Sequence, residues 1–161
     1  MVILVMGVAG SGKTTIGQLL AKELGWSFID ADDVHPPANI KKMSAGQPLN
    51  DEDRAPWLAA LRQRIEDCLA RSENAVVTCS ALKQRYRKVI VVDPQKVRIV
   101  HLHGSSELLR SRIAGRKGHF MSPSMLDSQL ASLEPPANAL TLDVVQTPAE
   151  LVARIRQEFH V

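Results

Sequence analysis

The chain has 161 residues, with 20 lysines and arginines against 17 aspartates and glutamates, and so a formal net charge of +3. Apolar residues make up 45% and charged residues 23%, which is ordinary globular usage and excludes disordered and fibrous classes. A surplus this small gives no indication of a nucleic-acid or membrane partner, and the length suits one domain with a substantial core.

Short β-branched runs alternate along the chain with longer stretches of helical periodicity. The runs carry little polar alternation, which predicts parallel strands covered on both faces, over residues 2–6, 26–29, 75–79, 97–102 and 140–145. Apolar residues at helical spacing predict helices over residues 14–24, 51–71, 105–115, 122–133 and 148–159. The alternation predicts a single domain over residues 1–161, with three α/β/α layers around a five-stranded parallel sheet.

Cysteine content and apolar run length bear on the compartment. The two cysteines, Cys68 and Cys79, are too few for a disulfide framework and lack metal-ligand spacing, so we expect reduced, buried thiols. No apolar run approaches the roughly 20 residues that a membrane span needs, and no basic residues precede the opening run as in a signal peptide. These features predict a soluble cytoplasmic protein.

The most specific motif follows the first predicted strand. Residues 7–14, Gly-Val-Ala-Gly-Ser-Gly-Lys-Thr, are a complete match to the phosphate-loop pattern GxxxxGKT. In this pattern backbone N–H groups point at phosphate oxygens, the lysine reaches the β- and γ-phosphates, and the Thr14 hydroxyl ligates Mg²⁺. With a strand before it and a helix after it, the motif predicts a P-loop NTPase fold and ATP contacts from Gly7, Gly10, Ser11, Gly12, Lys13, Thr14 and Thr15.

The reaction class is narrowed by what accompanies the loop. The Asp-x-x-Gly and Asn-Lys-x-Asp strings that Ras-type GTPases need do not occur in the sequence. Motor ATPases normally need a longer chain. The remaining interpretation is a small kinase whose acceptor site lies in the same domain.

Polar residues at two strand ends predict that acceptor site. Asp30 and Asp32 close the second strand, where period-two alternation directs both toward the phosphates. One carboxylate can hold Mg²⁺ and the other can take the proton of the acceptor hydroxyl, whereas a solvated turn or a helix N-cap is the alternative. Ser80, Lys83 and Arg87 follow the third strand and are predicted to lie over the acceptor; for the last two, a solvated helix face is the alternative.

The segment of about residues 35–57 predicts a substrate-covering insertion, because it combines several prolines and one glycine, Gly46, with polar side chains such as His35. Arg54 falls in the first turn of a predicted helix, where the helix dipole disfavours a cation. Such a placement indicates a ligand role, for instance bidentate binding of a carboxylate. An ordinary surface arginine is the alternative.

A basic lid is predicted over about residues 104–122. Small-molecule kinases must exclude water, and lid arginines can stabilise charge on the transferring phosphoryl group. Arg112 and Arg116 are four residues apart and share a helix face, although a charged surface helix would show the same spacing. The region 83–117 holds ten of the 20 basic residues and two acidic ones, which fits a site for small anions.

Several strings besides the phosphate loop resemble the gluconate kinases, relatives of the shikimate kinases in the adenylate-kinase-like group of P-loop kinases. They run from the phosphate loop to about residue 136 and comprise residues 30–36, 39–43, 46–49, 53–58, 79–83, 86–87, 118–121, 128–129 and 133–134. The resemblance implies transfer of the γ-phosphate of ATP to the 6-hydroxyl of D-gluconate with Mg²⁺, in a homodimer.

The resemblance also implies individual roles. Asp30 corresponds to the magnesium-side carboxylate, Asp32 to the group at the acceptor hydroxyl, and Arg54 to a ligand of the substrate carboxylate. Further implied contacts are His35 and Lys83 near the substrate, and Arg112, Arg116 and Pro148 near the nucleotide. A kinase for another acidic acceptor such as shikimate remains an alternative, as does a nucleotide-binding regulatory module, which would have no use for an acceptor base.

Overall fold

A five-stranded parallel sheet forms the centre of the computed structural model, which describes residues 1–115 and 123–161. Its strands are β1 (Val2–Met6), β2 (Ser27–Asp30), β3 (Ala75–Cys79), β4 (Val97–His103) and β5 (Leu140–Asp143). They pair in the order β2-β3-β1-β4-β5, and the four pairings between neighbouring strands are all parallel. The predicted five-stranded parallel sheet is confirmed: β1 and β3 have the predicted bounds, and the bounds of the other three strands differ by one or two residues.

Seven α-helices connect and cover the strands in the described residues: α1 (Lys13–Leu24), α2 (Pro37–Ser44), α3 (Asp51–Ala70), α4 (Gln84–Ile90), α5 (Ser106–Ala114), α6 (Pro123–Ser132) and α7 (Pro148–Phe159). Sequence periodicity predicted five of them. It missed α2 and α4 because each is about two turns long, too short for an apolar stripe to repeat.

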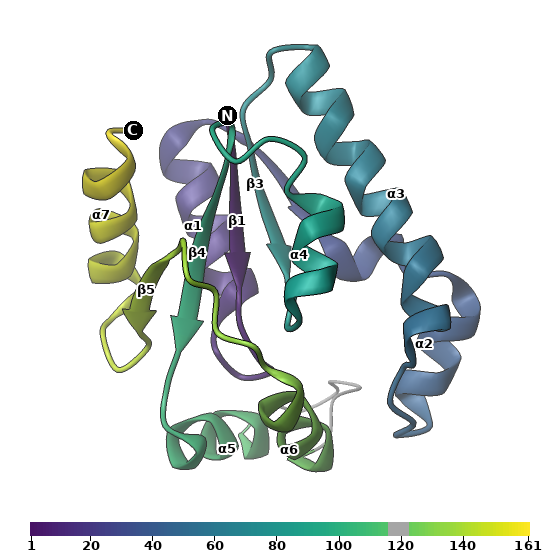
Figure 1. Ribbon diagram of the computed structural model, residues 1–161. Helices are drawn as coiled ribbons and strands as arrows, with labels where there is room; N and C mark the ends of the chain where they lie inside the picture. The colour runs from purple at the N-terminus through teal and green to yellow at the C-terminus, as the bar shows by residue number, and fades with distance from the viewer. Residues whose placement is uncertain (116–122) are drawn as a thin grey trace.

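Alternation along β1 divides the core into two halves. Ile3 and Val5 pack in the cluster that includes α1 and α7, whereas Val2, Leu4 and Met6 pack in the cluster that includes α3 and α4. All five β1 residues are fully buried, as expected for a central parallel strand with a helical layer on each face. The three-layer α/β/α architecture is therefore confirmed (Figure 1).

The ends toward which the strands point define the functional edge of the sheet. In Figure 1 the loop after β1 lies at this edge, and α2, α5 and α6 lie beyond it. α5 covers the first part of the predicted lid, whereas residues 116–122, including Arg116, lie outside the described residues. We expect a ligand at this edge, because open α/β sheets bind ligands at the carboxyl ends of their strands.

Two further expectations concern compartment and reactivity. Among the described helices, none combines the length and the apolar character that crossing a bilayer requires. Cys68 and Cys79 are free and buried, and burial raises the pKa of the Cys79 thiol to about 12. Both thiols therefore stay protonated at neutral pH, as structural cysteines do.

Candidate active site

The phosphate loop joins β1 to α1 and leaves the first turn of that helix available to an anion. Gly12 is the N-cap of α1 and adopts a left-handed conformation (φ 86°), and Gly10 (φ 78°) is also left-handed, a region that favours glycine. Within the described residues no side chain caps this helix and no acidic residue lies in its first turn. Its N–H groups and dipole can therefore meet phosphate oxygens.

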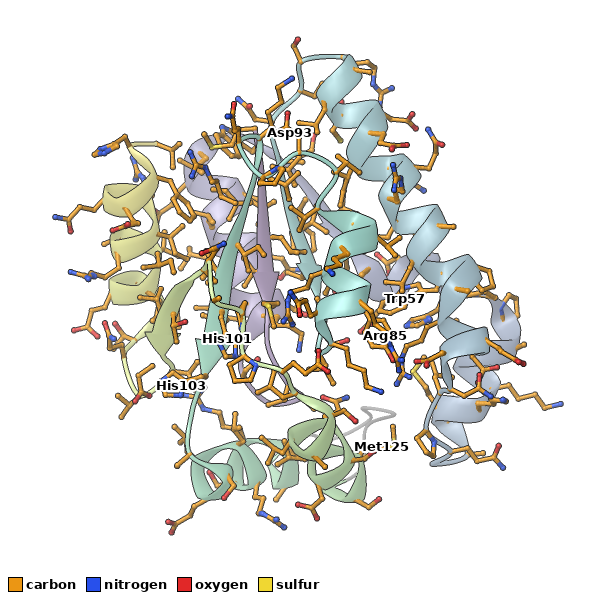
Figure 2. The ribbon with its side chains drawn as sticks, viewed as in Figure 1. Trp57, Arg85, Asp93, His101, His103 and Met125 are labelled. Atoms are coloured by element: carbon orange, nitrogen blue, oxygen red, sulfur yellow. The ribbon has the colours of Figure 1, made fainter. Side chains whose placement is uncertain are left out.

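A cleft opens beside this loop, between α3 and α4 on one side and α6 on the other; Figure 2 shows Trp57 and Met125 on the two sides. The structure brings most of the predicted site residues into its lining: Gly10, Gly12, Lys13, Thr14, Asp30, Asp32, His35, Arg54 and Ser80. These come from four separate stretches of sequence, so the fold gathers them as the strand-end rule predicts.

Two carboxylates lie on the floor of the cleft. Asp30 ends β2, and its Oδ1 accepts a hydrogen bond of 3.0 Å from the backbone N–H of Asp32. Asp32 lies in the 3₁₀ turn η1 (Ala31–Val34) and not in the strand. The predicted strand alternation therefore stops at Asp30, and the capped turn brings the second carboxylate to the cleft in its place.

The environment of Asp32 favours a proton acceptor. Its pKa is raised above the ordinary value, first by limited solvation in the cleft and next by the neighbouring charge of Asp30; Lys13 acts in the opposite direction. The side chain is nevertheless 56% exposed, so a substrate can reach it. A carboxylate of raised basicity beside the phosphate loop can receive a hydroxyl proton.

Thr14 and Asp30 offer the oxygens that Mg²⁺ prefers. The Thr14 hydroxyl donates to Asp30 Oδ2 over 3.4 Å. No cluster of three or more His, Cys, Asp or Glu side chains with metal-site spacing occurs in the described residues. Mg²⁺ commonly takes one or two protein oxygens and completes its shell with phosphates and water, so this pair fits that ion.

His35 is a buried, neutral side chain at the edge of the cleft. Its ring stacks on Trp57, with centroids 4.2 Å apart, and its side chain is 4% exposed. Burial, followed by the positive charge of Arg54, lowers the pKa of His35 to about 4. The ring therefore acts at neutral pH as a hydrogen-bonding group without charge.

Arg54 lies in the first helical turns of α3 and lines the cleft. Its Nη1 donates to the hydroxyl of Tyr86 over 3.2 Å, and that hydroxyl donates to Asp51 Oδ1 over 2.6 Å. Arg85 forms an ion pair of 2.5 Å with the same Asp51 carboxylate. The guanidinium of Arg54 is thus held from one side and leaves further donors for an anionic ligand.

Three cations surround the Tyr86 ring. Arg54, Arg85 and Lys83 lie 5.3, 5.5 and 5.8 Å from its centroid. Lys83 is the N-cap residue of α4 and is not among the residues that line the cleft. The three cations around this buried tyrosine concentrate positive charge where an anionic acceptor would enter.

A second pocket adjoins the first and shares Gly10 and Gly12 with it. It lies between the phosphate loop, α5 and the turn after β5, and its lining includes Ser11, Thr15, Arg112 and Pro148. Arg112 donates from Nη2 to the backbone carbonyl of Val144 over 2.6 Å. Several predicted nucleotide residues thus meet in a pocket whose lining does not include the acidic pair.

Comparison with known proteins identifies the family. A family model described as an AAA domain matches residues 2–136. The chain is 44% identical to a probable gluconokinase of Xenopus tropicalis, over 98% of this chain and 93% of that protein. It is 48% identical to the gluconokinase of Gluconobacter oxydans, over 84% of this chain and 76% of that protein. The chain belongs to the gluconokinase family.

A solved structure supports the same assignment. The crystal structure of a gluconokinase from Sinorhizobium meliloti superposes with a TM-score of 0.83 at 44% identity, covering 98% of this chain and 94% of that chain. The similarity to gluconokinases thus extends from the sequence to the arrangement of the sheet, the phosphate loop and the surrounding helices. The predicted P-loop kinase fold is confirmed.

Arg87 departs from its predicted role. It is 6% exposed and donates hydrogen bonds of 2.8, 3.0 and 2.7 Å to the carbonyl oxygens of Ala81, Leu82 and Glu134. It does not line the cleft. In this member of the gluconokinase family Arg87 fastens the loop after β3 to the segment after α6, so we correct its assignment from substrate ligand to structural residue.

Sequence reasoning missed several residues that line the cleft: Trp57, Thr78, Tyr86, Met125, Ser128, Gln129 and Ser132. Gln129 accepts a hydrogen bond of 2.7 Å from the Ala9 N–H of the phosphate loop, 120 residues away. Gluconokinase-like strings include Tyr86 and Gln129, which was the available signal, but nothing in their spacing places them at the phosphate loop.

Proposed function

We propose that this chain transfers the γ-phosphate of ATP to the 6-hydroxyl of D-gluconate, giving 6-phospho-D-gluconate and ADP. One observation carries the proposal: the phosphate loop lies at the junction of two pockets that share Gly10 and Gly12. A nucleotide in one pocket would direct its terminal phosphate into the other, where the acidic pair and Arg54 lie. The family's gluconokinases support gluconate as the acceptor.

The residues divide the work by charge. Lys13 neutralises the β- and γ-phosphates, and Arg54 binds the carboxylate of the sugar acid. Thr14 and Asp30 hold Mg²⁺, which when bound offsets charge on the phosphate oxygens. Ser80 contacts the acceptor from the β3 side, Lys83 adds positive charge beside the Tyr86 ring, and Arg112 and Arg116 of the lid stabilise the transferring group.

Asp32 receives the proton. The acceptor oxygen forms a bond to the γ-phosphorus while the bond from that phosphorus to the leaving ADP oxygen breaks, and the hydroxyl proton passes to the Asp32 carboxylate. The raised pKa of Asp32 suits this step, since a more basic carboxylate is a better acceptor. We further propose a cytoplasmic homodimer, on the strength of the family resemblance and the reduced cysteines; size-exclusion chromatography with light scattering tests the dimer.

A coupled ADP-release assay over a panel of sugar acids tests the reaction. We expect turnover with D-gluconate and little with shikimate or with aldonates other than gluconate; turnover with shikimate alone would contradict the proposal. Asp32→Asn should lower kcat by about 10²-fold or more with nucleotide affinity retained. Asp33→Asn is the matched control, since this exposed neighbour does not line the cleft; equal losses in both variants would remove Asp32 from the proton transfer.

A further inference from the structure

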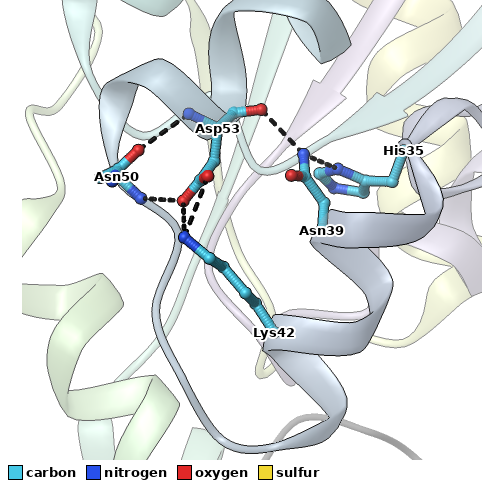
Figure 3. A network of polar contacts seen from close by, with 5 residues as sticks. All are labelled: His35, Asn39, Lys42, Asn50 and Asp53. Atoms are coloured by element: carbon cyan, nitrogen blue, oxygen red, sulfur yellow. Dashed lines mark hydrogen bonds and ion pairs between the residues drawn. The ribbon is translucent and has the colours of Figure 1, made fainter.

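The orientation of the Asn39 amide is fixed by a backbone carbonyl. Asn39 belongs to α2, is 3% exposed and donates from Nδ2 to the carbonyl oxygen of Asp53 over 2.8 Å. Since a carbonyl can only accept, the amide nitrogen and not the amide oxygen faces α3. The same nitrogen lies 3.3 Å from Nδ1 of His35 (Figure 3), so its second hydrogen is available to that ring nitrogen.

This contact decides where His35 carries its proton. A ring nitrogen that accepts a hydrogen bond is unprotonated, and a neutral imidazole then has its hydrogen on the other nitrogen, Nε2. The ring is neutral because burial and Arg54 lower its pKa to about 4. Its plane is fixed by the stack on Trp57, with an interplanar angle of 12°. His35 therefore presents an Nε2–H donor in a single orientation.

The donor lies beside the proposed proton acceptor. His35 Nε2 is 3.9 Å from Asp32 Oδ1, too far for a hydrogen bond between them. One hydroxyl oxygen at about 2.8 Å from each atom spans this distance, which is the usual hydrogen-bond length for such groups. That oxygen would accept from Nε2–H and donate to Asp32, and a second lone pair would remain for the γ-phosphorus.

We propose that Asn39 is a positioning residue that holds His35 in its Nε2–H form, so that His35 and Asp32 together orient the acceptor hydroxyl. In the reaction, the oxygen–phosphorus bond forms, the bond to the ADP oxygen breaks and the proton moves to Asp32, while the His35 proton stays on Nε2. The identity of the acceptor rests on the proposed function; the protonated nitrogen of His35 does not.

The first experiment determines the tautomer without substrate. Long-range ¹H–¹⁵N spectra at pH 7 distinguish the Nε2–H form, the Nδ1–H form and imidazolium, and His35→Gln identifies the signal. We expect Nε2–H in the wild type. Asn39→Asp, whose carboxylate can only accept, should convert the ring to Nδ1–H or imidazolium. Nδ1–H in the wild type, or unchanged Nε2–H in Asn39→Asp, would overturn the proposal.

A matched control separates positioning from general support of α2. Lys42 also joins α2 to Asp53, through contacts of 3.0 and 2.9 Å to the carboxylate oxygens. Lys42→Gln removes this ion pair but leaves the contact between Asn39 and the Asp53 carbonyl. We expect its His35 spectrum to remain Nε2–H; loss of that form in Lys42→Gln would show that the helix placement, and not Asn39, sets the tautomer.

The second experiment measures catalysis with two substitutions of His35 itself. Glutamine places an amide donor near the Nε2 position, whereas asparagine reaches only the Nδ1 position. We expect kcat with D-gluconate to stay within about fivefold in His35→Gln and to fall about 50-fold in His35→Asn, with the KM for ATP unchanged in both. Equal losses would overturn the hydroxyl contact. If the wild type fails to phosphorylate gluconate, the proposed function falls, and the spectra still decide the role of Asn39.

Discussion

The buried imidazole of His35 makes the stability of the fold depend on pH in a defined window. Its pKa is about 4 in the folded chain against 6.5 for an ordinary histidine. Above pH 6.5 the ring is neutral in both the folded and the unfolded chain, so it contributes nothing to the pH dependence of the unfolding free energy. Between pH 6.5 and 4 the unfolded chain binds a proton that the folded chain does not, so stability falls as pH falls.

The size of this loss follows from the width of the window. Each pKa unit corresponds to about 1.36 kcal/mol, so the interval from 6.5 to about 4 corresponds to about 3 kcal/mol of unfolding free energy. The figure applies with little screening because the side chain is 4% exposed. Compared with the roughly 5–15 kcal/mol of a typical domain, this loss is readily measured.

Urea unfolding of the wild type and of His35→Gln, repeated from pH 7.5 to pH 4, tests the reasoning. The quantity of interest is the difference in unfolding free energy between the two proteins, in which the other titrating groups cancel. Asp32 has the opposite sign, since its raised pKa favours the folded state on acidification, but it is present in both. We expect the wild type to lose about 3 kcal/mol more than the variant. A difference that stays constant with pH would refute a neutral, buried His35.

Three further predictions concern Lys13 of the phosphate loop, the contact between Tyr86 and Arg54, and Arg87. Lys13→Ala should abolish phosphoryl transfer while thermal unfolding stays unchanged; wild-type turnover would overturn the phosphate-loop assignment. Tyr86→Phe removes the hydroxyl that accepts from Arg54, so steady-state kinetics should show a KM for gluconate raised roughly tenfold with kcat little changed; an unchanged KM would mean that other contacts hold Arg54. Arg87→Met leaves two buried carbonyls and one part-buried carbonyl without their donor, and chemical denaturation should show a loss of about 2–4 kcal/mol; a raised KM without that loss would indicate that Arg87 binds the substrate.

Local sequence information was sufficient wherever a feature depends on neighbouring residues. The phosphate loop needs only a strand, a spaced set of glycines and a helix, and all three are contiguous. β1 could be assigned because a fully buried strand is apolar at every position. The acidic pair was placed correctly for a partly wrong reason: strand alternation was assumed, whereas the Asp30 side chain caps the turn that carries Asp32.

The three-dimensional structure was needed to distinguish residues of the same type that have different contacts. Arg54 and Arg87 lie in the first turns of α3 and α4, and both were predicted to bind substrate, Arg54 from its unfavourable place in the helix dipole and Arg87 from its place after the third strand. One lines the cleft, and the other donates to carbonyls that include Glu134, 47 residues away. Gln129 reaches the phosphate loop from α6 across 120 residues. Contacts of this separation depend on the packing of whole elements and leave no periodic trace in the sequence.

The first turn of α3 joins stability to substrate recognition. Asn50 and Asp53 form a reciprocal capping box that fixes where the helix begins. In the same turn, the backbone carbonyl of Asp53 accepts a hydrogen bond from Asn39, and the Asp51 carboxylate accepts one from the Tyr86 hydroxyl. Three acidic residues in this turn offset the unfavourable dipole that Arg54 would otherwise meet. Arg54, whose position is unfavourable when judged from the sequence alone, is therefore held at a capped helix end. Loss of the cap would lower the stability of the fold and weaken the proposed binding of an anionic acceptor by Arg54.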